Sequence, residues 1–232
     1  MGLFLSFYLN LISNIFGTVL SLAVVMAELS LPFWALERAH IDPKSLNIYA
    51  YRIESIFDSL FSNKDAKLKP DWPKIVKELV FTFFLCLIIF IPYTAGYTGF
   101  QLFLAHSQDK ELFFSLNWPP MLGKEILTQI FVVAFPEELF YRGFLQGALL
   151  KKWPNQKFLF ALPYGKAIII TNLIFACGHL MGGFHTMRVL TFFPGLIFSW
   201  IVYKRGNLLS AIIFHAACNI LGQILYASCY IR

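Results

Sequence analysis

Charged side chains are scarce in this chain of 232 residues, because Asp, Glu, Lys and Arg together make up only 14% of it, against roughly 25% in an ordinary soluble domain. Apolar residues account for 58%, and 26 residues are phenylalanine. So little polar surface cannot cover a soluble globule, which excludes intrinsic disorder and a soluble nucleic-acid-binding domain. The composition predicts one integral membrane domain over residues 1–232, whose partner is the lipid bilayer and not nucleic acid.

Several other features are missing, and each absence removes a class of protein. The four cysteines lie in apolar stretches without a Cys-x-x-Cys spacing, which favours buried free thiols over a disulfide scaffold. No His-Glu-x-x-His motif is present, so a zincin is excluded. No aspartate follows Asp109, and no Gly-x-Ser-Gly occurs. An aspartyl dyad in the later helices is therefore impossible, and a serine protease is disfavoured.

Long apolar runs are abundant, and a helix needs about 20 apolar residues to cross the hydrocarbon core. Six runs are candidates, at residues 1–27, 79–105, 122–150, 167–187, 189–203 and 207–231. Pro92 predicts a kink in the second run. We therefore expect an all-α, polytopic transmembrane helix bundle of about six spans, a multi-pass protein of the cell membrane. The fifth run is the shortest, and a re-entrant path through it would flip the C-terminus.

Residues 37–78 differ from the rest, since they hold 15 of the 32 charged residues. Within this polar loop, apolar residues of the stretch 48–61 share one helical face, which predicts an amphipathic helix lying in the membrane interface. A helix packed on the bundle fits the same pattern. The loops after spans one, three and five carry 14 Lys and Arg residues, against four on the opposite side, which places those loops in the cytoplasm.

Ionisable side chains at membrane depth are costly to bury and by default indicate function. The candidates are Glu28, Glu137, Glu138, Arg142, His179, His185 and His215. No Asp or Glu follows Glu138, so any carboxylate that works with the later histidines is almost certainly Glu137 or Glu138. His185 follows Gly182-Gly183 and is expected at a loop edge, outside the site.

Glu138 and Arg142 are four residues apart, about 40° around an α-helix, and are expected to form a supporting ion pair. Glu137 has no such local partner and is interpreted as the free carboxylate. Pro136 predicts that a helix restarts just before it, with a helix N-terminus that favours negative charge. The alternative is that both glutamates only bridge helices.

The later histidines recur with the same four-residue spacing, in Phe175–His179 and in His215–Asn219. Glu137, His179 and Asn219 each lie 13 or 14 residues from the basic end of their span, about 20 Å along a helix. Three helices are thus expected to bring polar groups to one depth. A buried glutamate serves as a general base towards water, with imidazoles or an amide stabilising an oxyanion. Alternatively Glu and His hold Zn²⁺ with Asn as an outer ligand, and the residues alone leave both open.

Three motifs in this order resemble those of the CAAX-protease and bacteriocin-processing (CPBP, or Abi) membrane endopeptidases: Glu137-Glu138-Leu-Phe-Tyr-Arg142, Phe175-x-x-x-His179 and His215-x-x-x-Asn219. The resemblance covers a catalytic core at residues 122–225. It implies a glutamic intramembrane endopeptidase in which Glu137 activates water with help from Asn219. His179 and His215 would form the oxyanion site, with Glu138 and Arg142 in support.

The same resemblance implies no cofactor, and if a metal is used, Glu137, His179 and His215 would be its ligands. The expected substrates are membrane-associated, exported or C-terminally tagged proteins or peptides, lipidated CAAX-like tails among them. Two rival functions use the same polar cluster: a membrane transporter or proton relay, and a catalytically idle bacteriocin-immunity protein.

Overall fold

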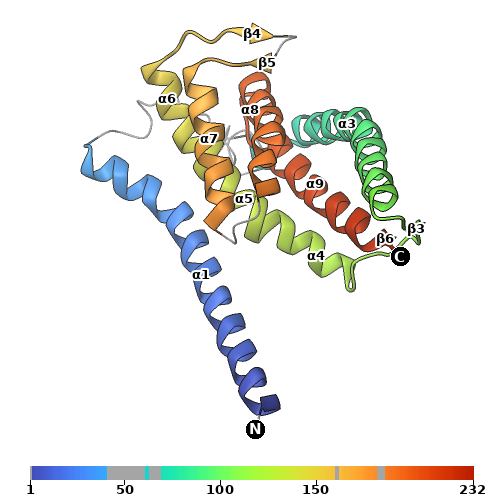
Figure 1. Cartoon of the computed structure of the whole chain (residues 1–232). Coiled ribbons are helices and arrows are strands. Elements are labelled where there is room, and N and C mark those ends of the chain that lie inside the picture. Colours follow the sequence, from blue (N-terminus) through green and yellow to red (C-terminus); the bar gives the residue numbers. More distant parts are fainter. Residues whose placement is uncertain (1, 41–60, 63–68, 160–161, 182–185) are drawn as a thin grey trace.

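The computed structural model describes residues 2–40, 61–62, 69–159, 162–181 and 186–232. The predicted all-α bundle is confirmed over these residues (Figure 1). Its main helices are α1 (Gly2–Arg38), α3 (Trp72–Ser107), α7 (Lys166–Met181), α8 (Phe192–Arg205) and α9 (Leu209–Ser228). The predicted interfacial helix at 48–61 lies almost entirely outside the described residues.

The strands form three short two-stranded ribbons in the segments between helices and at the end of α9. In order, β1 (Phe61–Ser62) pairs with β2 (Lys69–Pro70), β3 (Leu112–Phe114) with β6 (Cys229–Ile231), and β4 (Phe158–Leu159) with β5 (Leu162–Pro163), all antiparallel. The β3–β6 ribbon joins the chain after α3 to the end of α9. There Ser228 receives hydrogen bonds from the backbone amides of Ser115 and Asn117.

In the part of the chain that the structure describes, three helices are long and apolar enough to cross a membrane: Val19–Arg38, Trp72–Ser107 and Leu209–Ser228. The first continues well beyond residue 27, where the sequence predicted its end. The other expected spans are also helical, but α7 has 16 residues and α8 has 14, which corresponds to about 21 to 24 Å of rise. The count of six spans stays a prediction.

Helix α3 begins and bends where its sequence directs. The side chain of Asp71 accepts a hydrogen bond from the amide of Lys74 and caps the helix, and Pro73 occupies the first turn, where no amide hydrogen is needed. Pro92 lies inside the helix and removes one hydrogen bond. Figure 1 shows α3 sharply bent, as predicted.

Glu78, near the start of α3, forms hydrogen bonds with residues of α8 and α9. Its carboxylate accepts two hydrogen bonds from Arg205 of α8, at 2.6 and 2.8 Å, and one from Ser210 of α9 at 2.7 Å. Glu78 is 4% exposed, so the pairing compensates a charge that would otherwise be costly to bury.

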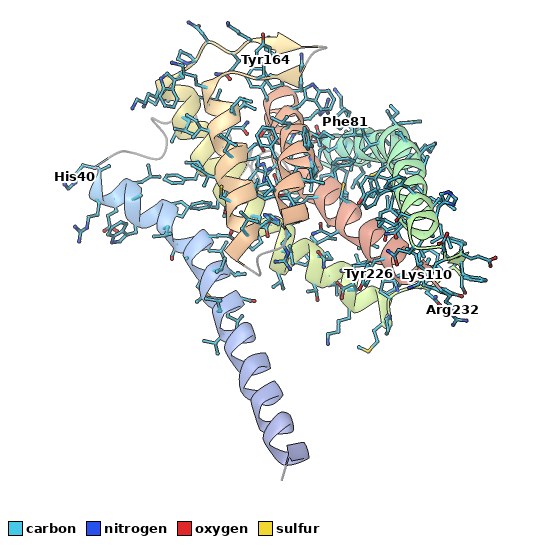
Figure 2. The ribbon with its side chains drawn as sticks, viewed as in Figure 1. His40, Phe81, Lys110, Tyr164, Tyr226 and Arg232 are labelled. Atoms are coloured by element: carbon cyan, nitrogen blue, oxygen red, sulfur yellow. The ribbon has the colours of Figure 1, made fainter. Side chains whose placement is uncertain are left out.

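The bundle has two distinct polar ends. The end of α8 lies beside the β4–β5 ribbon, where Phe158 contacts Tyr203 and Lys204. Figure 2 places Tyr164 at this end and Lys110 with Arg232 at the opposite one. The basic loops after the third and fifth spans therefore lie at the same end of the molecule. Most of the loop after the first span lies outside the described residues, and the assignment of this end to the cytoplasm stays a prediction.

Candidate active site

A single irregular helical stretch carries both glutamates. It runs through α4 (Leu122–Thr128), η1 (Gln129–Ala134), α5 (Phe135–Glu137), η2 (Glu138–Leu145) and α6 (Gln146–Lys152). The segments η1 and η2 are π-helical, and the amides that close them bond five residues back, Phe135 to Ile130 and Gln146 to Tyr141. Such wide turns recur at functional sites.

The predicted restart at Pro136 is wrong. The residues on both sides of Pro136 keep right-handed helical backbone angles, so no helix terminus is available to favour the charge of Glu137. Proline lacks the amide hydrogen that an α turn needs, and the chain is π-helical on both sides of this short α segment instead of ending one helix and beginning another.

Arg142 forms the predicted pair with Glu138, at 3.2 Å, and both side chains are fully buried. Its guanidinium also donates to the side-chain oxygen of Asn172 and to the carbonyl of Gly195, each at 3.3 Å. The ring of Phe175 stacks under it, 4.0 Å from the guanidinium carbon. Arg142 thereby joins η2, α7 and α8 around one buried charge.

His215 of α9 lies between the two carboxylates. Its Nδ1 is 2.8 Å from Glu138 Oε1, and its Nε2 is 3.8 Å from Glu137 Oε2. The imidazole stacks on Phe198, with ring centroids 4.6 Å apart. Because an ionised carboxylate only accepts hydrogen bonds, Nδ1 is the donor and Nε2 faces Glu137. Glu138 therefore does more than balance Arg142, since it also fixes the orientation of this histidine.

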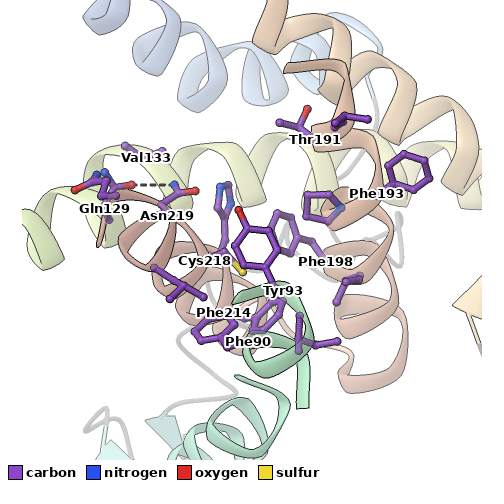
Figure 3. Close-up of a pocket in the computed structure, with 18 of the residues that line it drawn as sticks. Phe90, Tyr93, Gln129, Val133, Thr191, Phe193, Phe198, Phe214, Cys218 and Asn219 are labelled. Carbon is purple, nitrogen blue, oxygen red and sulfur yellow. Dashed lines mark hydrogen bonds between the residues drawn. The ribbon is translucent and has the colours of Figure 1, made fainter. Parts of the chain in front are cut away.

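His179, His215 and Asn219 line one cavity of about 910 Å³. Glu137 is not among the lining residues, but its Oε2 is 3.8 Å from Nε2 of His215, which is. The wall is mostly aromatic and aliphatic and includes Tyr93 and Phe214 (Figure 3). His179 Nδ1 donates to the carbonyl of Phe175 at 3.0 Å, because a carbonyl can only accept. In both histidines Nδ1 is therefore hydrogen-bonded, to the Phe175 carbonyl or to Glu138, and Nε2 makes neither of these bonds.

The structure adds polar residues that the motifs do not contain. Asn172 accepts from Arg142 and donates to Ser199 of α8, and it precedes His179 by seven residues, two turns on the same face of α7. That spacing is the signal that could have found it. Gln129 accepts a hydrogen bond from Asn219 at 2.8 Å, and no motif spacing indicated it.

Glu28 of α1 is the remaining carboxylate of this region. It is 8% exposed and near enough to Glu137 for the two charges to repel one another. Helix α1 thus contributes to the surroundings of Glu137, although residues 1–121 carried no recognisable motif. His185 lies outside the described residues.

A metal ion does not fit the site as it is arranged. Among the residues that the structure places, no three His, Cys, Asp or Glu side chains are grouped closely enough to hold an ion. Hydrogen bonds from Nδ1 to Phe175 and Glu138 leave only Nε2 of each ring to face an ion. We derive no catalytic step through a metal, and a metal-free reaction stays a prediction.

Gly195 gives this site a strict steric requirement. A Cβ atom there would overlap Asn172 Oδ1 and stand 3.1 Å from the Arg142 guanidinium. We expect Gly195→Ala to lower the free energy of unfolding by about 1–3 kcal/mol, because it displaces partners of a buried charge. Thermal unfolding of the purified protein measures the change.

The matched control for Gly195→Ala is Gly99→Ala in α3, where a Cβ would meet nothing within 4 Å. Alanine is the better helix former by about 1 kcal/mol, so this variant is expected to unfold at the same temperature as the wild type or higher. Equal destabilisation by both substitutions would contradict the steric argument.

Comparison with known proteins agrees with the motifs. Residues 119–221 match the family model described as type II CAAX prenyl endopeptidase, Rce1-like. The chain has no significant match among curated proteins or among solved structures. The matched segment contains all three motifs and every residue of the cluster around Glu138. The chain is therefore an integral membrane protein that carries, over residues 119–221, an Rce1-like domain of the CPBP family of CAAX-type endopeptidases.

Proposed function

We propose that this protein is an intramembrane glutamic endopeptidase in which Glu137 is the general base. The observation that carries the proposal is the position of His215 between two carboxylates, one of which, Glu138, holds it in place while the other is left free. Glu137 Oε2 is buried and has no hydrogen-bond partner among the described residues. A buried acceptor in that state is costly, and a water held between it and His215 Nε2 would satisfy both groups.

The reaction follows from these positions. Glu137 takes a proton from the water, and the resulting hydroxide attacks the carbonyl carbon of the scissile peptide bond. The carbonyl oxygen becomes an oxyanion, which His179 and His215 stabilise through Nε2. Because Nδ1 of each ring already donates, this role requires each ring to carry a proton on both nitrogens. The proton on Glu137 passes to the amide nitrogen as the carbon–nitrogen bond breaks, which releases an amine and a carboxylic acid that keeps the second proton of the water.

Charge balance supports the donor role of His215. Glu137 and Glu138 carry two negative charges when ionised, and Arg142 supplies one positive charge. An imidazolium at His215 would neutralise the cluster, and its Nε2 would then donate while Nδ1 still donates to Glu138. The donor role of His215 is therefore compatible with a cluster that carries no net charge, and isolated charge is expensive away from water.

The substrate is proposed to be a membrane-associated protein or peptide with a CAAX-like C-terminal tail. The apolar lining of the cavity suits an apolar segment, and one peptide bond must reach His179 and His215. The basic loops would hold the β4–β5 end in the cytoplasm of a multi-pass protein in the cell membrane. The site residues lie about 20 Å along their helices from that end, which is towards the outer leaflet. Peptide tails that reach the site from the outer leaflet would then be natural substrates.

The test uses the full chain purified into lipid vesicles, with two peptides that end in the same CAAX-type tail, one farnesylated and one not. Mass spectrometry of the products is expected to reveal one cleavage position near the tail in at least one peptide, dependent on Glu137. Proton flux across the vesicle membrane without any cleaved peptide would contradict the proposal and favour a relay.

A further inference from the structure

One end of the bundle carries lysines that no carboxylate from the same part of the chain balances. This end consists of the β4–β5 ribbon, the last turns of α6 and α8, and the first turn of α7, and the sequence contains no Asp or Glu after Glu138. Four exposed lysines form this surface, which we term the lysine face: Lys152, Lys157, Lys166 and Lys204. Within the described ranges, no salt bridge involves any of the four.

The β4–β5 ribbon brings these lysines together. The backbone amide of Tyr164 donates to the carbonyl of Lys157 at 2.9 Å, so the residue before β4 lies opposite the residue after β5. Lys166 follows two residues later as the first residue of α7. Lys204, from the last turn of α8, lies over the ring of Phe158, 5.9 Å from its centroid. Figure 1 shows the ribbon at the ends of α7 and α8.

Aromatic rings lie between the lysines. Phe158 and Tyr164 expose 48% and 44% of their surface, and the ammonium group of Lys152 is 5.1 Å from the ring centroid of Trp153. Mixed aromatic and basic side chains are typical of the lipid headgroup layer, where rings enter the acyl boundary and ammonium groups meet phosphates. The composition of the lysine face therefore fits a membrane interface.

Helix length places the lysine face at the level of the headgroups. Helices α7 and α8 have 16 and 14 residues, which gives about 21 to 24 Å of rise against about 30 Å of hydrocarbon. A short apolar helix is accommodated by local thinning of the bilayer and by flanking side chains that reach the headgroups. The basic ends of α7 and α8 are therefore held in the headgroup layer and do not rise clear of it.

The local charges at the start of α7 attract an anion. Lys166 is the first residue of this helix, and the first turn contains no acidic residue. The N-terminus of a helix carries a partial positive charge, so a lysine there adds like charge to like. An anionic group from outside the chain would be attracted by both.

We propose that the lysine face binds the phosphate groups of anionic phospholipids, such as phosphatidylglycerol, in the leaflet at the β4–β5 end. The partner is a lipid headgroup and not a soluble anion, because the exposed rings and the short helices hold the lysines at the membrane surface. Each lysine near an anionic surface contributes roughly a fivefold preference, so the lysines of the face act together. The inference does not depend on the proposed endopeptidase activity.

The test exposes the full chain, purified in detergent, to equal amounts of phosphatidylglycerol and phosphatidylcholine with the same acyl chains. Native mass spectrometry counts the lipids of each kind that stay bound. The wild type is expected to retain phosphatidylglycerol at least about tenfold over phosphatidylcholine. The triple variant Lys157→Gln, Lys166→Gln and Lys204→Gln is expected to lose most of this preference. Arginine at the same three positions keeps the charge and is expected to keep the preference.

The matched control replaces three exposed basic residues away from the lysine face: Lys110→Gln, Lys124→Gln and Arg232→Gln. It removes the same net charge and is expected to keep most of the wild-type preference. Thermal unfolding gives a second measurement, because a lipid that binds the folded protein raises its unfolding temperature. Phosphatidylglycerol should do so for the wild type and the control, and less for the glutamine variant of the lysine face.

Three results would overturn the proposal: equal retention of both lipids by the wild type, an unchanged preference in the glutamine variant of the lysine face, or an equal loss in both triple variants. The last result would show that net charge alone attracts the lipid. Displacement of bound phosphatidylglycerol by millimolar inorganic phosphate would also contradict it, because the lysine face would then be a site for a soluble anion.

Discussion

Replacing Glu137 with glutamine is expected to lower kcat about 10²- to 10⁴-fold, the range that a general base contributes, while the yield of folded protein stays at the wild-type level. Glutamine has nearly the same shape but cannot take a proton from water. Glu137 is part-exposed and has no ion pair shorter than the 3.8 Å contact with His215 in the described residues, so neutralising it strands no buried charge. Peptide cleavage and size-exclusion profiles of the purified variant measure the two effects.

Glu111→Gln is the matched control, because it makes the same change at an exposed carboxylate beside the β3–β6 ribbon. It is expected to cleave at the wild-type rate. Cleavage by Glu137→Gln at a rate near the wild type would remove the general base from the mechanism. Loss of folded protein in that variant would show instead that Glu137 is mainly structural.

Unlike Glu137→Gln, which is expected to keep its yield of folded protein, Arg142→Met is expected to lose much of its stability. The substitution leaves Glu138 fully buried without its cation and removes the hydrogen bonds to Asn172 and Gly195. Breaking one side of a buried pair costs roughly 3–5 kcal/mol. We expect the yield of folded protein and the unfolding temperature to fall well below those of the wild type.

The double variant of Arg142→Met with Glu138→Gln tests the cause of that loss. Removing the stranded charge should recover part of the stability, although cleavage stays low because His215 loses its charged partner. Arg232→Met, at an exposed arginine, is expected to be neutral. If the double variant were no more stable than Arg142→Met, then packing on Phe175, rather than charge, would account for the effect.

Short-range spacing predicted the local parts of this site well. Four-residue intervals identified the pair of Glu138 with Arg142. Of the three residues expected at one depth, His179 and Asn219 line one cavity, whereas Glu137 does not line it and approaches it only through His215. Such predictions succeed because the α-helix fixes rise and rotation per residue. The bond from His215 to Glu138 spans 77 residues, and no local pattern indicates which of two adjacent glutamates a distant histidine contacts.

The π-helical turns explain why Gln129 escaped prediction. On a regular α-helix, Gln129 and Glu137 are about 80° apart, too far to be assigned to one face. If η1 absorbs one extra residue within a single turn, the two come within about 20° of the same direction. Predictions from hydrophobic periodicity assume a constant number of residues per turn. They therefore miss a side chain, such as that of Gln129, whose direction depends on a π-helical turn.

The same turns bear on how this chain aligns with related ones. A π turn accommodates one more residue than an α turn while the helix on either side keeps its rotation. A chain one residue shorter here could form an uninterrupted α-helix with its flanking side chains on unchanged faces. Single-residue gaps between relatives are therefore expected inside this helix, at Gln129–Ala134 or Glu138–Leu145, where an aligner that confines gaps to loops would misplace Glu137 by one position.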